Sequence, residues 1–429
     1  MLLTDTIMAF PIRTWSLAWV MIDGSLISTL WPLFHYLPGE IHFDESQWDG
    51  YYRANVAFAN AVKHVARSGD LIWVQDYHLM LLPALLRDAL ADLSNIRVGF
   101  FLHIPFPSSE VYRALPVQSQ ILRGLLQGDL IGFHTYDHVR HFLGACARLL
   151  GMETRPNGVF LAGRFVQVGS FPIGIEASKF MAALQTPAVI ERVEGLRERF
   201  RGQHVILGVE RLDYIKGVPH KLHALDIFLD RYPQFRGRVV LLQVAVPTRS
   251  DVEEYQNLRT TVNELVGRIN SKYGTFDYTP VQYVYRSIPF DELVALYRLA
   301  DVCLVTSTRD GMNLVHHPAS CVTSHDQVAL EYVASQQDQS GVLVLSEFAG
   351  AAQSMNGALI INPWNINAVA DAIYEALTLP ADMAAANQQK LLDYVQKFTA
   401  SHWGKTFVDE LQVSPPSQGP ATSGLRLHN

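Results

Sequence analysis

One stretch decides the fold: Val302-Cys303-Leu304-Val305-Thr306, which passes into Ser307-Thr308-Arg309-Asp310-Gly311-Met312-Asn313-Leu314-Val315. The first five residues have the uninterrupted apolar pattern of a buried strand. The residues that follow place one carboxylate, Asp310, beside a glycine turn with free backbone amides. At the carboxyl end of a parallel strand, such a turn is where α/β proteins usually hold a phosphorylated ligand.

A second polar element lies earlier in the chain, Glu210-Arg211-Leu212-Asp213-Tyr214-Ile215-Lys216-Gly217, and it supplies two cations. With Pro219 opening a helix, the turn can present Arg211, Lys216 and the helix N-terminus to a diphosphate leaving group. Neutralising that group as its bond breaks is electrostatic catalysis without a metal. The alternative is a surface pair that bridges Glu210 and Asp213. Together, the two elements indicate a site for a nucleotide-sugar diphosphate and one sugar hydroxyl.

Composition limits the class of protein. A chain of 429 residues is too long for one ordinary core, so two domains are expected. A hydrophobic content of 49% with 17% charged residues is typical of a well-packed globular protein, and a net charge of −7 argues against a general nucleic-acid binder. The three cysteines, Cys146, Cys303 and Cys321, are expected to be reduced thiols. Residues 7–20 are apolar but contain Arg13, so neither a signal peptide nor a membrane anchor is expected, and the cytoplasm is the predicted location.

Short apolar runs alternate with helical patterns along the chain. The pattern predicts strands at 71–74, 97–102 and 130–133, with helices at 79–90 and 136–150. The second half repeats this scheme, with strands at 205–209, 239–244, 302–306 and 341–345 and a helix at 221–231. Such a rhythm predicts two doubly wound parallel sheets, with the boundary near residues 172–175.

Three further residues are candidates for the site, each with a plain alternative. His103 follows a predicted strand, where a lone histidine is more often structural. Asp76 also lies at a strand end, where binding residues gather, but a helix N-cap is the alternative there. Trp31 is either a platform on which a sugar stacks or part of the core. Taken singly, none of the three decides the function.

Taken together, these segments resemble the trehalose-6-phosphate synthases. The shared segments occur in the same order over roughly residues 31 to 412: 31–39, 75–79, 99–107, 210–217, 267–274 and 309–315. The resemblance implies the two-domain GT-B fold, with two Rossmann-like domains facing a cleft that holds the active site. It also implies a retaining, UDP-forming transfer of glucose from UDP-glucose to glucose 6-phosphate, in which the acceptor hydroxyl attacks as UDP leaves.

The resemblance implies a role for each matching residue. Arg211 and Lys216 hold the donor diphosphate, Asp310 binds hydroxyls of the donor glucose, and His103 contacts the transferred glucose near its 6-hydroxyl. The donor site further includes the segment Gly311, Met312, Asn313, Leu314 and Val315, and Glu331, which holds the ribose. The acceptor site is lined by Trp31, Asp76 and Arg249. No metal and no cofactor is implied, because UDP-glucose is a substrate and the two cations supply the charge.

The resemblance also sets the expected domains. Residues 1–175 form an acceptor domain, 176–375 a nucleotide-sugar domain, 376–412 helices that pack back on the first domain, and 413–429 a disordered tail. Three departures from the family pattern are expected to matter: the N-terminal segment is shorter, as in an N-terminally truncated fungal-type member, Ile22 replaces a tyrosine, and 316–330 form an insert. His316, His317, Cys321 and His325 in that insert fit no common metal spacing.

Two other functions stay open at this point. One is a catalytically impaired binding or regulatory subunit of a trehalose-synthesising complex, and the other is a GT-B transferase with a different acceptor. The partners that the resemblance implies are the two substrates and either a homo-oligomer or a complex with trehalose-phosphate phosphatase and regulatory subunits. It implies no nucleic acid and no membrane partner, and it places the chain in the stress response.

Overall fold

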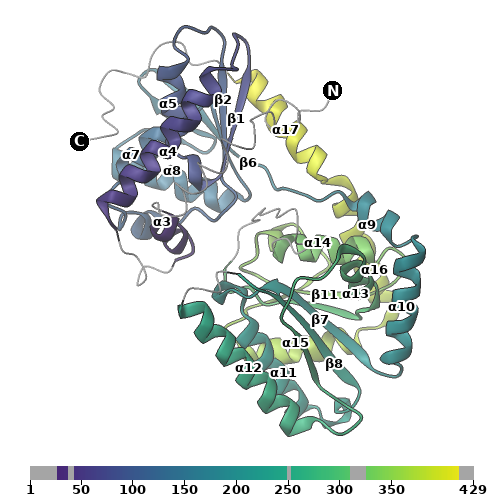
Figure 1. Ribbon diagram of the computed structural model, residues 1–429. Coiled ribbons are helices and arrows are strands. Elements are labelled where there is room, and N and C mark those ends of the chain that lie inside the picture. The colour runs from purple at the N-terminus through teal and green to yellow at the C-terminus, as the bar shows by residue number, and fades with distance from the viewer. Residues whose placement is uncertain (1–26, 37–42, 249–252, 310–324, 415–429) are drawn as a thin grey trace. The chain divides into compact units, whose positions relative to one another are not determined.

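The protein divides into two compact units. The computed structural model describes residues 27–36, 43–248, 253–309 and 325–414 (Figure 1). Unit 1 comprises Met1–Phe171 with Gly404–Asn429, and unit 2 comprises Pro172–Trp403. The chain thus first leaves unit 1 beside residues 172–175, the segment where the sequence places the boundary.

Unit 1 is built on a six-stranded mixed sheet in the order β1-β2-β3-β6-β5-β4. Its strands are β1 Leu71–Gln75, β2 Arg97–Phe101, β3 Leu130–Phe133, β4 Thr154–Arg155, β5 Gly158–Leu161 and β6 Arg164–Ser170. The first three strands and β6 are parallel, whereas β4, β5 and β6 form an antiparallel meander. The meander was not predicted, because β4 and β5 are short and β6 is only partly apolar.

Helices cover both faces of this sheet. The helices on one side are α3 Ile27–Phe34, α4 Glu45–Lys63, α5 Leu82–Ala89, α6 Ser109–Tyr112, α7 Gln118–Leu125 and α8 Tyr136–Leu150, with the 3-10 turn η2 Tyr77–Leu79. The other face is covered by α17 Ala400–Val413 (Figure 1). There Phe407 stacks on Trp73 with 4.3 Å between ring centroids, and a Cβ on Gly99 would lie 2.7 Å from its ring. The glycine therefore lets α17 approach the sheet closely.

Unit 2 contains a six-stranded sheet that is parallel throughout, in the order β12-β11-β10-β7-β8-β9. Its strands are β7 His204–Arg211, β8 Val239–Val246, β9 Val281–Val284, β10 Val302–Val305, β11 Val342–Ser346 and β12 Leu359–Ile361. All four predicted strands are present. Strand β8 is buried along its whole length, as expected for a parallel strand covered on both faces.

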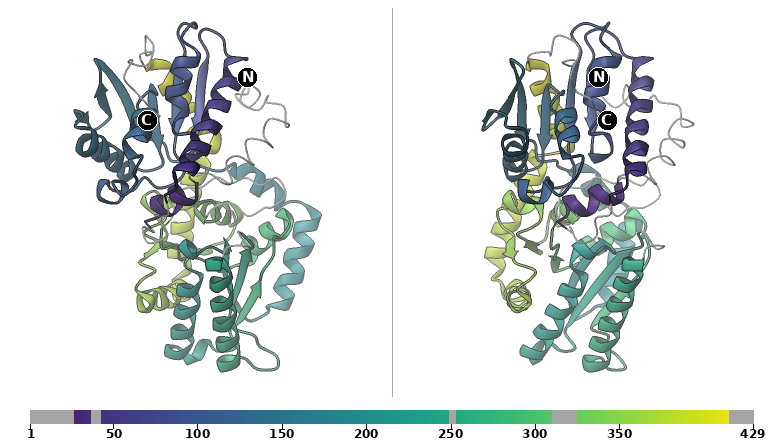
Figure 2. Two further views of the ribbon diagram at one scale, coloured as in Figure 1. Left: turned by 60° about the vertical axis from the view of Figure 1, so that its left-hand side comes forward. Right: turned by 90° about the vertical axis from the view of Figure 1, so that its left-hand side faces the viewer.

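Two helical layers enclose the sheet of unit 2. On one face, α11 Val218–Arg231 packs against α12 Glu253–Tyr273 and α15 Ile366–Thr378, as Figure 2 shows from two sides. The other layer consists of α9 Ala177–Ala183, α10 Pro187–Arg199, α13 Phe290–Leu299, α14 His325–Ser335 and α16 Ala381–Lys397. The 3-10 turns are η3 Tyr214–Lys216, η4 Pro233–Phe235 and η5 Gly350–Gln353. This arrangement is the doubly wound architecture that the sequence predicts.

The C-terminal segment differs from the expectation in where it packs. Residues 376–412 were expected to pack on the first domain, but α16 buries Leu391, Leu392 and Val395 in the core of unit 2. Only from Gly404 onward does the chain belong to unit 1. The predicted tail also begins too early, because Val413 is in α17 and the Ser414 carbonyl accepts a hydrogen bond from Arg97 Nε at 3.0 Å. The rest of the tail, 415–429, lies outside the described residues.

Two other sequence expectations can be compared with the fold. Cys146 and Cys303 are buried free thiols, while Cys321 lies outside the described residues. Of the helices in the described ranges, none is both long enough and apolar enough to cross a membrane.

Candidate functional site

The turn that carries Arg211 and Lys216 lies at the carboxyl edge of the sheet of unit 2. Strand β7 ends at Arg211, η3 ends at Lys216, and α11 begins directly after Gly217. The Asp213 carboxylate shapes the turn by accepting hydrogen bonds from the Ile215 backbone N–H at 3.4 Å and from the Tyr255 hydroxyl at 3.2 Å. Asp213 is thus occupied in holding the loop.

Hydrogen bonds join this turn to the segment that follows β10. The Thr306 hydroxyl donates to the carbonyl oxygen of Gly217 at 3.0 Å. The Ile215 carbonyl accepts two hydrogen bonds from Thr308, from its backbone N–H at 2.8 Å and from its hydroxyl at 3.1 Å. The two polar elements singled out in the sequence therefore lie side by side, as adjacent parallel strands require.

Gly217 is needed for this close approach. Its φ of +67° is in the left-handed region, and a Cβ there would lie 1.9 Å from the Thr306 carbonyl oxygen. An L-residue would therefore meet both backbone strain and a backbone clash. The glycine lets the cationic turn lie directly against the end of β10.

The two predicted cations differ in burial. Lys216 is 1% exposed, whereas Arg211 is half-buried. The turn therefore offers one desolvated and one accessible cation, an arrangement suited to a diphosphate because desolvation strengthens charge-assisted hydrogen bonds. The remaining predicted donor residues, Asp310 to Val315, and the acceptor residue Arg249 lie outside the described residues.

A buried ion pair lies beside these cations, and the sequence reasoning missed it. Lys221 Nζ lies 2.8 and 3.1 Å from the two carboxylate oxygens of Glu210, and both side chains are at most 1% exposed. Burial raises the pKa of Glu210, and the charges of Lys221 and Lys216 oppose that rise. The surface pair considered as an alternative is therefore not what forms, because Glu210 pairs with a lysine from the next helix.

Glu331, the predicted ribose ligand, lies in α14 and is 4% exposed. Its Oε2 accepts a hydrogen bond from the Tyr297 hydroxyl of α13 at 2.8 Å. Burial, followed by the neighbouring Glu331 charge, raises the pKa of Tyr297 far above its usual range, so the phenol stays a donor. The carboxylate is therefore held in one orientation by its neighbour.

In unit 1, His103 and Asp76 lie together at the carboxyl ends of β2 and β1. The Asp76 carboxylate accepts the His103 backbone N–H at 3.2 Å, and the Asp76 N–H donates to the Phe101 carbonyl at 2.8 Å. The His103 Nε2 atom lies 2.8 Å from Gln75 Oε1. Asp76 has a φ of +67° and makes no side-chain cap to η2, so the helix-cap alternative does not describe it. Strained backbone of this kind is typical of functional sites.

Burial sets the protonation states of this group. It lowers the pKa of His103 to about 3 and that of His78 to about 4, so both rings are neutral near pH 7. Burial raises the pKa of Asp76 to about 6. Hydrogen bonds from the backbone N–H groups of Tyr77 and His103 lower this pKa and so oppose part of the rise. Near neutral pH, the group thus combines a neutral imidazole with a carboxylate, which suits hydrogen bonding to sugar hydroxyls.

The surroundings of Trp31 favour a place in the core over a role as a platform on which a sugar stacks. Its side chain is 3% exposed, and its ring stacks on His35 with 4.2 Å between centroids. His35 Nδ1 in turn bonds the Trp31 carbonyl oxygen at 2.7 Å. This burial supports a packing role, and an acceptor-binding role for Trp31 stays a prediction.

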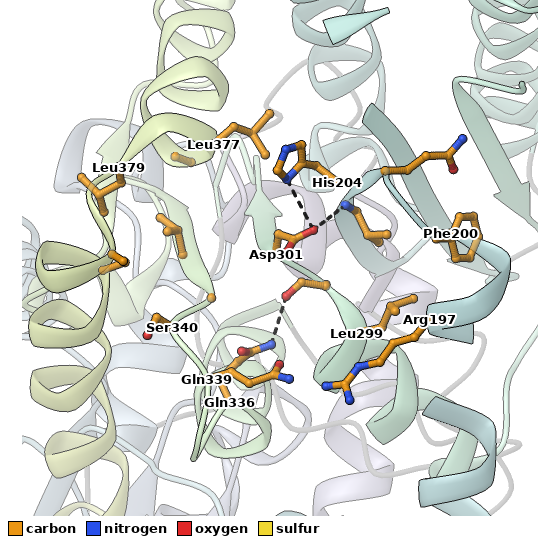
Figure 3. Close-up of a pocket in the computed structure, with 18 of the residues that line it drawn as sticks. Arg197, Phe200, His204, Leu299, Asp301, Gln336, Gln339, Ser340, Leu377 and Leu379 are labelled. Atoms are coloured by element: carbon orange, nitrogen blue, oxygen red, sulfur yellow. Dashed lines mark hydrogen bonds and ion pairs between the residues drawn. The ribbon is translucent and has the colours of Figure 1, made fainter. Parts of the chain in front are cut away.

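A hollow of about 500 Å³ opens at the opposite, amino edge of the sheet of unit 2 (Figure 3). Asp301 lies in it, with its carboxylate accepting the Val205 N–H at 2.7 Å and lying 4.0 Å from His204 Nδ1. The carboxyl ends of α10, α13 and α15 line it, including Phe200, Ala300 and Leu377, together with the amino end of α16 at Ala381. None of the described residues that the sequence assigns to the donor or acceptor site is among those that line this hollow. The geometry therefore favours the carboxyl edges as the functional site.

No group of three or more His, Cys, Asp or Glu side chains within the described ranges is arranged to hold a metal ion. Arg211, at the end of β7, and Lys216, at the end of η3, are the cations that the sequence assigns to a phosphorylated ligand. Two Rossmann-like sheets, each with polar groups at its carboxyl edge, define a nucleotide-sugar transferase of the GT-B class.

Comparisons with known proteins give the family. Residues 23–413 match glycosyltransferase family 20, and the chain belongs to that family. It is 56% identical over 391 residues to the UDP-forming α,α-trehalose-phosphate synthase of Schizosaccharomyces pombe, spanning 91% of this chain and 74% of that protein. It is 55% identical over 397 residues to the 56 kDa subunit of the UDP-forming synthase of Saccharomyces cerevisiae, spanning 92% and 78%.

Among solved structures, the fold is similar to the Escherichia coli trehalose-6-phosphate protein bound with UDP-2-fluoro glucose. The TM-score is 0.83 at 36% identity, with 91% of this chain and 83% of that chain covered. This similarity confirms the GT-B fold and the family that the sequence motifs predict.

Proposed function

We propose that this protein transfers glucose from UDP-glucose to glucose 6-phosphate, giving trehalose 6-phosphate and UDP with retention at the anomeric carbon. The named activity of the relatives supports this proposal. The observation that carries it is the set of hydrogen bonds joining the Arg211–Gly217 turn to Thr306 and Thr308, because these bonds place two cations beside the end of β10.

In the proposed reaction, the anomeric hydroxyl of the acceptor forms the new bond to C1 of the donor glucose. The bond from C1 to the UDP oxygen breaks on the same face, and the hydroxyl proton passes to the leaving diphosphate. Arg211 and Lys216 stabilise the charge that develops on that group. No metal or cofactor is part of this proposal, because the two cations supply the positive charge.

The remaining roles are proposed in the same way. Glu331, oriented by Tyr297, holds the donor ribose, and His103 accepts or donates a hydrogen bond at the donor glucose. Asp76, Arg249 and Trp31 bind the acceptor. Asp310 and the Gly311–Val315 segment complete the donor site.

We also propose a cytoplasmic enzyme that acts in a complex with other subunits of trehalose synthesis. The relative from Saccharomyces cerevisiae is named as a subunit, which supports an assembly of this kind. Gel filtration of the pure chain, alone and with trehalose-phosphate phosphatase, tests it, and a monomer under both conditions speaks against it.

The test of the activity is UDP release by the purified chain. With UDP-glucose present, we expect release that depends on added glucose 6-phosphate. Binding of UDP-glucose without any turnover would instead identify an inactive binding subunit. Turnover with fructose 6-phosphate or a glucan, but not with glucose 6-phosphate, would identify a different acceptor.

A further inference from the structure

Asp76, the predicted acceptor residue of unit 1, has a backbone conformation that its surroundings must hold. Its φ of +67° and ψ of 170° fall in a region that is essentially reserved for glycine. On one side, the Asp76 N–H donates to the Phe101 carbonyl oxygen at 2.8 Å. The carboxylate accepts the His103 backbone N–H at 3.2 Å, yet 17% of the side chain stays exposed. The carboxylate is therefore anchored and still accessible to a ligand.

Tyr51 of α4 bonds the turn η2, which begins directly after Asp76. Its hydroxyl donates to the Tyr77 carbonyl oxygen at 2.7 Å and accepts the Met80 backbone N–H at 3.0 Å. The residue is 1% exposed, and burial raises the pKa of Tyr51 far above its usual range, so the hydroxyl keeps its proton. One hydroxyl thus joins the start and the end of the turn to the helix.

Asn55 makes a second connection between the same helix and the same turn. It lies four residues beyond Tyr51, so the two side chains are on one face of α4. Its Nδ2 atom donates to the carbonyl oxygens of Tyr51 at 2.9 Å and of His78 at 3.1 Å. Both partners can only accept, so they determine which way the amide faces. Asn55 is buried like Tyr51, so both residues act on the backbone and not on a ligand.

We propose that Tyr51 and Asn55 are positioning residues for Asp76, which hold its strained backbone so that its carboxylate is presented to the acceptor sugar. The inference rests on the proposed function for the role of Asp76 in binding glucose 6-phosphate. The conformation of Asp76 does not depend on that role. Without the bonds from α4, the turn η2 can shift, and Asp76 relaxes toward an ordinary φ with its carboxylate turned away.

The kinetic test uses Tyr51→Phe, which removes the hydroxyl and keeps the ring. We expect KM for glucose 6-phosphate to rise about tenfold, because two buried hydrogen bonds to the turn are lost. The Kd for UDP-glucose should stay unchanged. Tyr112→Phe is the matched control, because Tyr112 is also buried in unit 1 and its hydroxyl donates to the Gln118 carbonyl oxygen at 3.3 Å, outside η2. This control should lose stability with no change in KM.

A second background separates positioning from a general loss of packing. In Asp76→Ala, the substitution Tyr51→Phe should raise KM no further, because the hydroxyl acts through the carboxylate. Asn55→Ala should behave as Tyr51→Phe does in both backgrounds. An unchanged KM in Tyr51→Phe, or an equal rise in the wild-type and Asp76→Ala backgrounds, overturns the positioning role. Should Asp76→Ala turn over too slowly for a KM, urea unfolding decides the question.

Urea unfolding tests the conformation of Asp76 without any need for activity. Glycine ordinarily lowers stability relative to alanine, but at this φ and ψ only glycine is unstrained. We expect Asp76→Gly to unfold at a higher urea concentration than Asp76→Ala, and the difference to shrink when Tyr51→Phe is added. No difference between glycine and alanine, or the same difference in both backgrounds, overturns the inference. Should the difference behave as expected while glucose 6-phosphate neither binds nor reacts, the proposed function fails and the support of Asp76 by α4 stands.

Discussion

The Thr306 hydroxyl donates a hydrogen bond to the Gly217 carbonyl oxygen at 3.0 Å, and so ties the end of β10 to the first residue before α11. The contact joins two elements that are far apart in the sequence. It fixes the position of Lys216, which directly precedes Gly217, against the segment that leads to Asp310. The segments proposed to bind the diphosphate and the sugar are therefore joined through backbone contacts at the carboxyl edge of the same sheet.

Gly217→Ala should disrupt this edge. The new Cβ would lie 1.9 Å from the Thr306 carbonyl, and the left-handed φ alone costs about 1–2 kcal/mol for an L-residue. We expect a loss of at least that size in the free energy of unfolding in urea, together with weaker UDP-glucose binding. Gly195→Ala is the control, because Gly195 lies in α10 with open space at its Cβ position, and there alanine should be neutral or stabilising.

Lys216→Ala should weaken UDP-glucose binding by a few kcal/mol if the ammonium meets a desolvated phosphate. Isothermal titration calorimetry with UDP-glucose measures this directly. Lys179→Ala, at an exposed lysine of α9, should leave the affinity unchanged. An affinity for UDP-glucose equal to that of the wild type in Lys216→Ala would refute the role given to this residue.

Lys221→Met should destabilise unit 2 by about 3–5 kcal/mol, because it leaves the Glu210 carboxylate buried without its partner. The penalty should grow as the pH rises, since the unpaired carboxyl must lose its proton inside the core. Chemical denaturation at pH 5.5 and 8 tests this. The double variant Lys221→Met/Glu210→Gln should recover most of the stability, and equal losses in the single and double variants would contradict the account.

Stability should fall in acid partly because of His103. Its pKa is about 3 when folded, below the ordinary 6.5, so the unfolded chain binds more protons between these values and stability drops as the pH falls through that window. Asp76, with its pKa raised to about 6, acts in the opposite sense between its usual 3.8 and 6. His103→Gln should therefore reduce the slope of stability against pH below pH 6.5, by at most about 1.4 kcal/mol per pH unit. An unchanged slope would show that the ring is not buried in its neutral form.

The sequence predicts the strand–turn–helix units of this fold because each has a local signal. Val302–Val305 is apolar throughout, and the Gly217–Pro219 segment marks a turn before a helix. Partners across the fold have no such signal. Lys221 looks like an ordinary helix residue, and its burial against Glu210 depends on how α11 lies on β7.

The same limit explains the C-terminal segment. Helices α16 and α17 have similar amphipathic patterns, and the pattern does not show which sheet each helix covers. Helix α17 packs on the sheet of unit 1 because Gly99 and Gly132 have no side chains and so leave room for Phe407. Nor does a sequence pattern show that the side chains of Gln75 and His103 lie within hydrogen-bond distance. Their proximity results from the in-register pairing of β1 and β2.

The most direct test of the central claim is the product formed from UDP-glucose labelled with ¹³C at the anomeric carbon and from glucose 6-phosphate. The account predicts a single new α-configured anomeric signal, in a 1,1-linked disaccharide that retains its phosphate, together with one equivalent of UDP. A β-configured product, free labelled glucose as the main product, or no product from a chain that still binds UDP-glucose would contradict it.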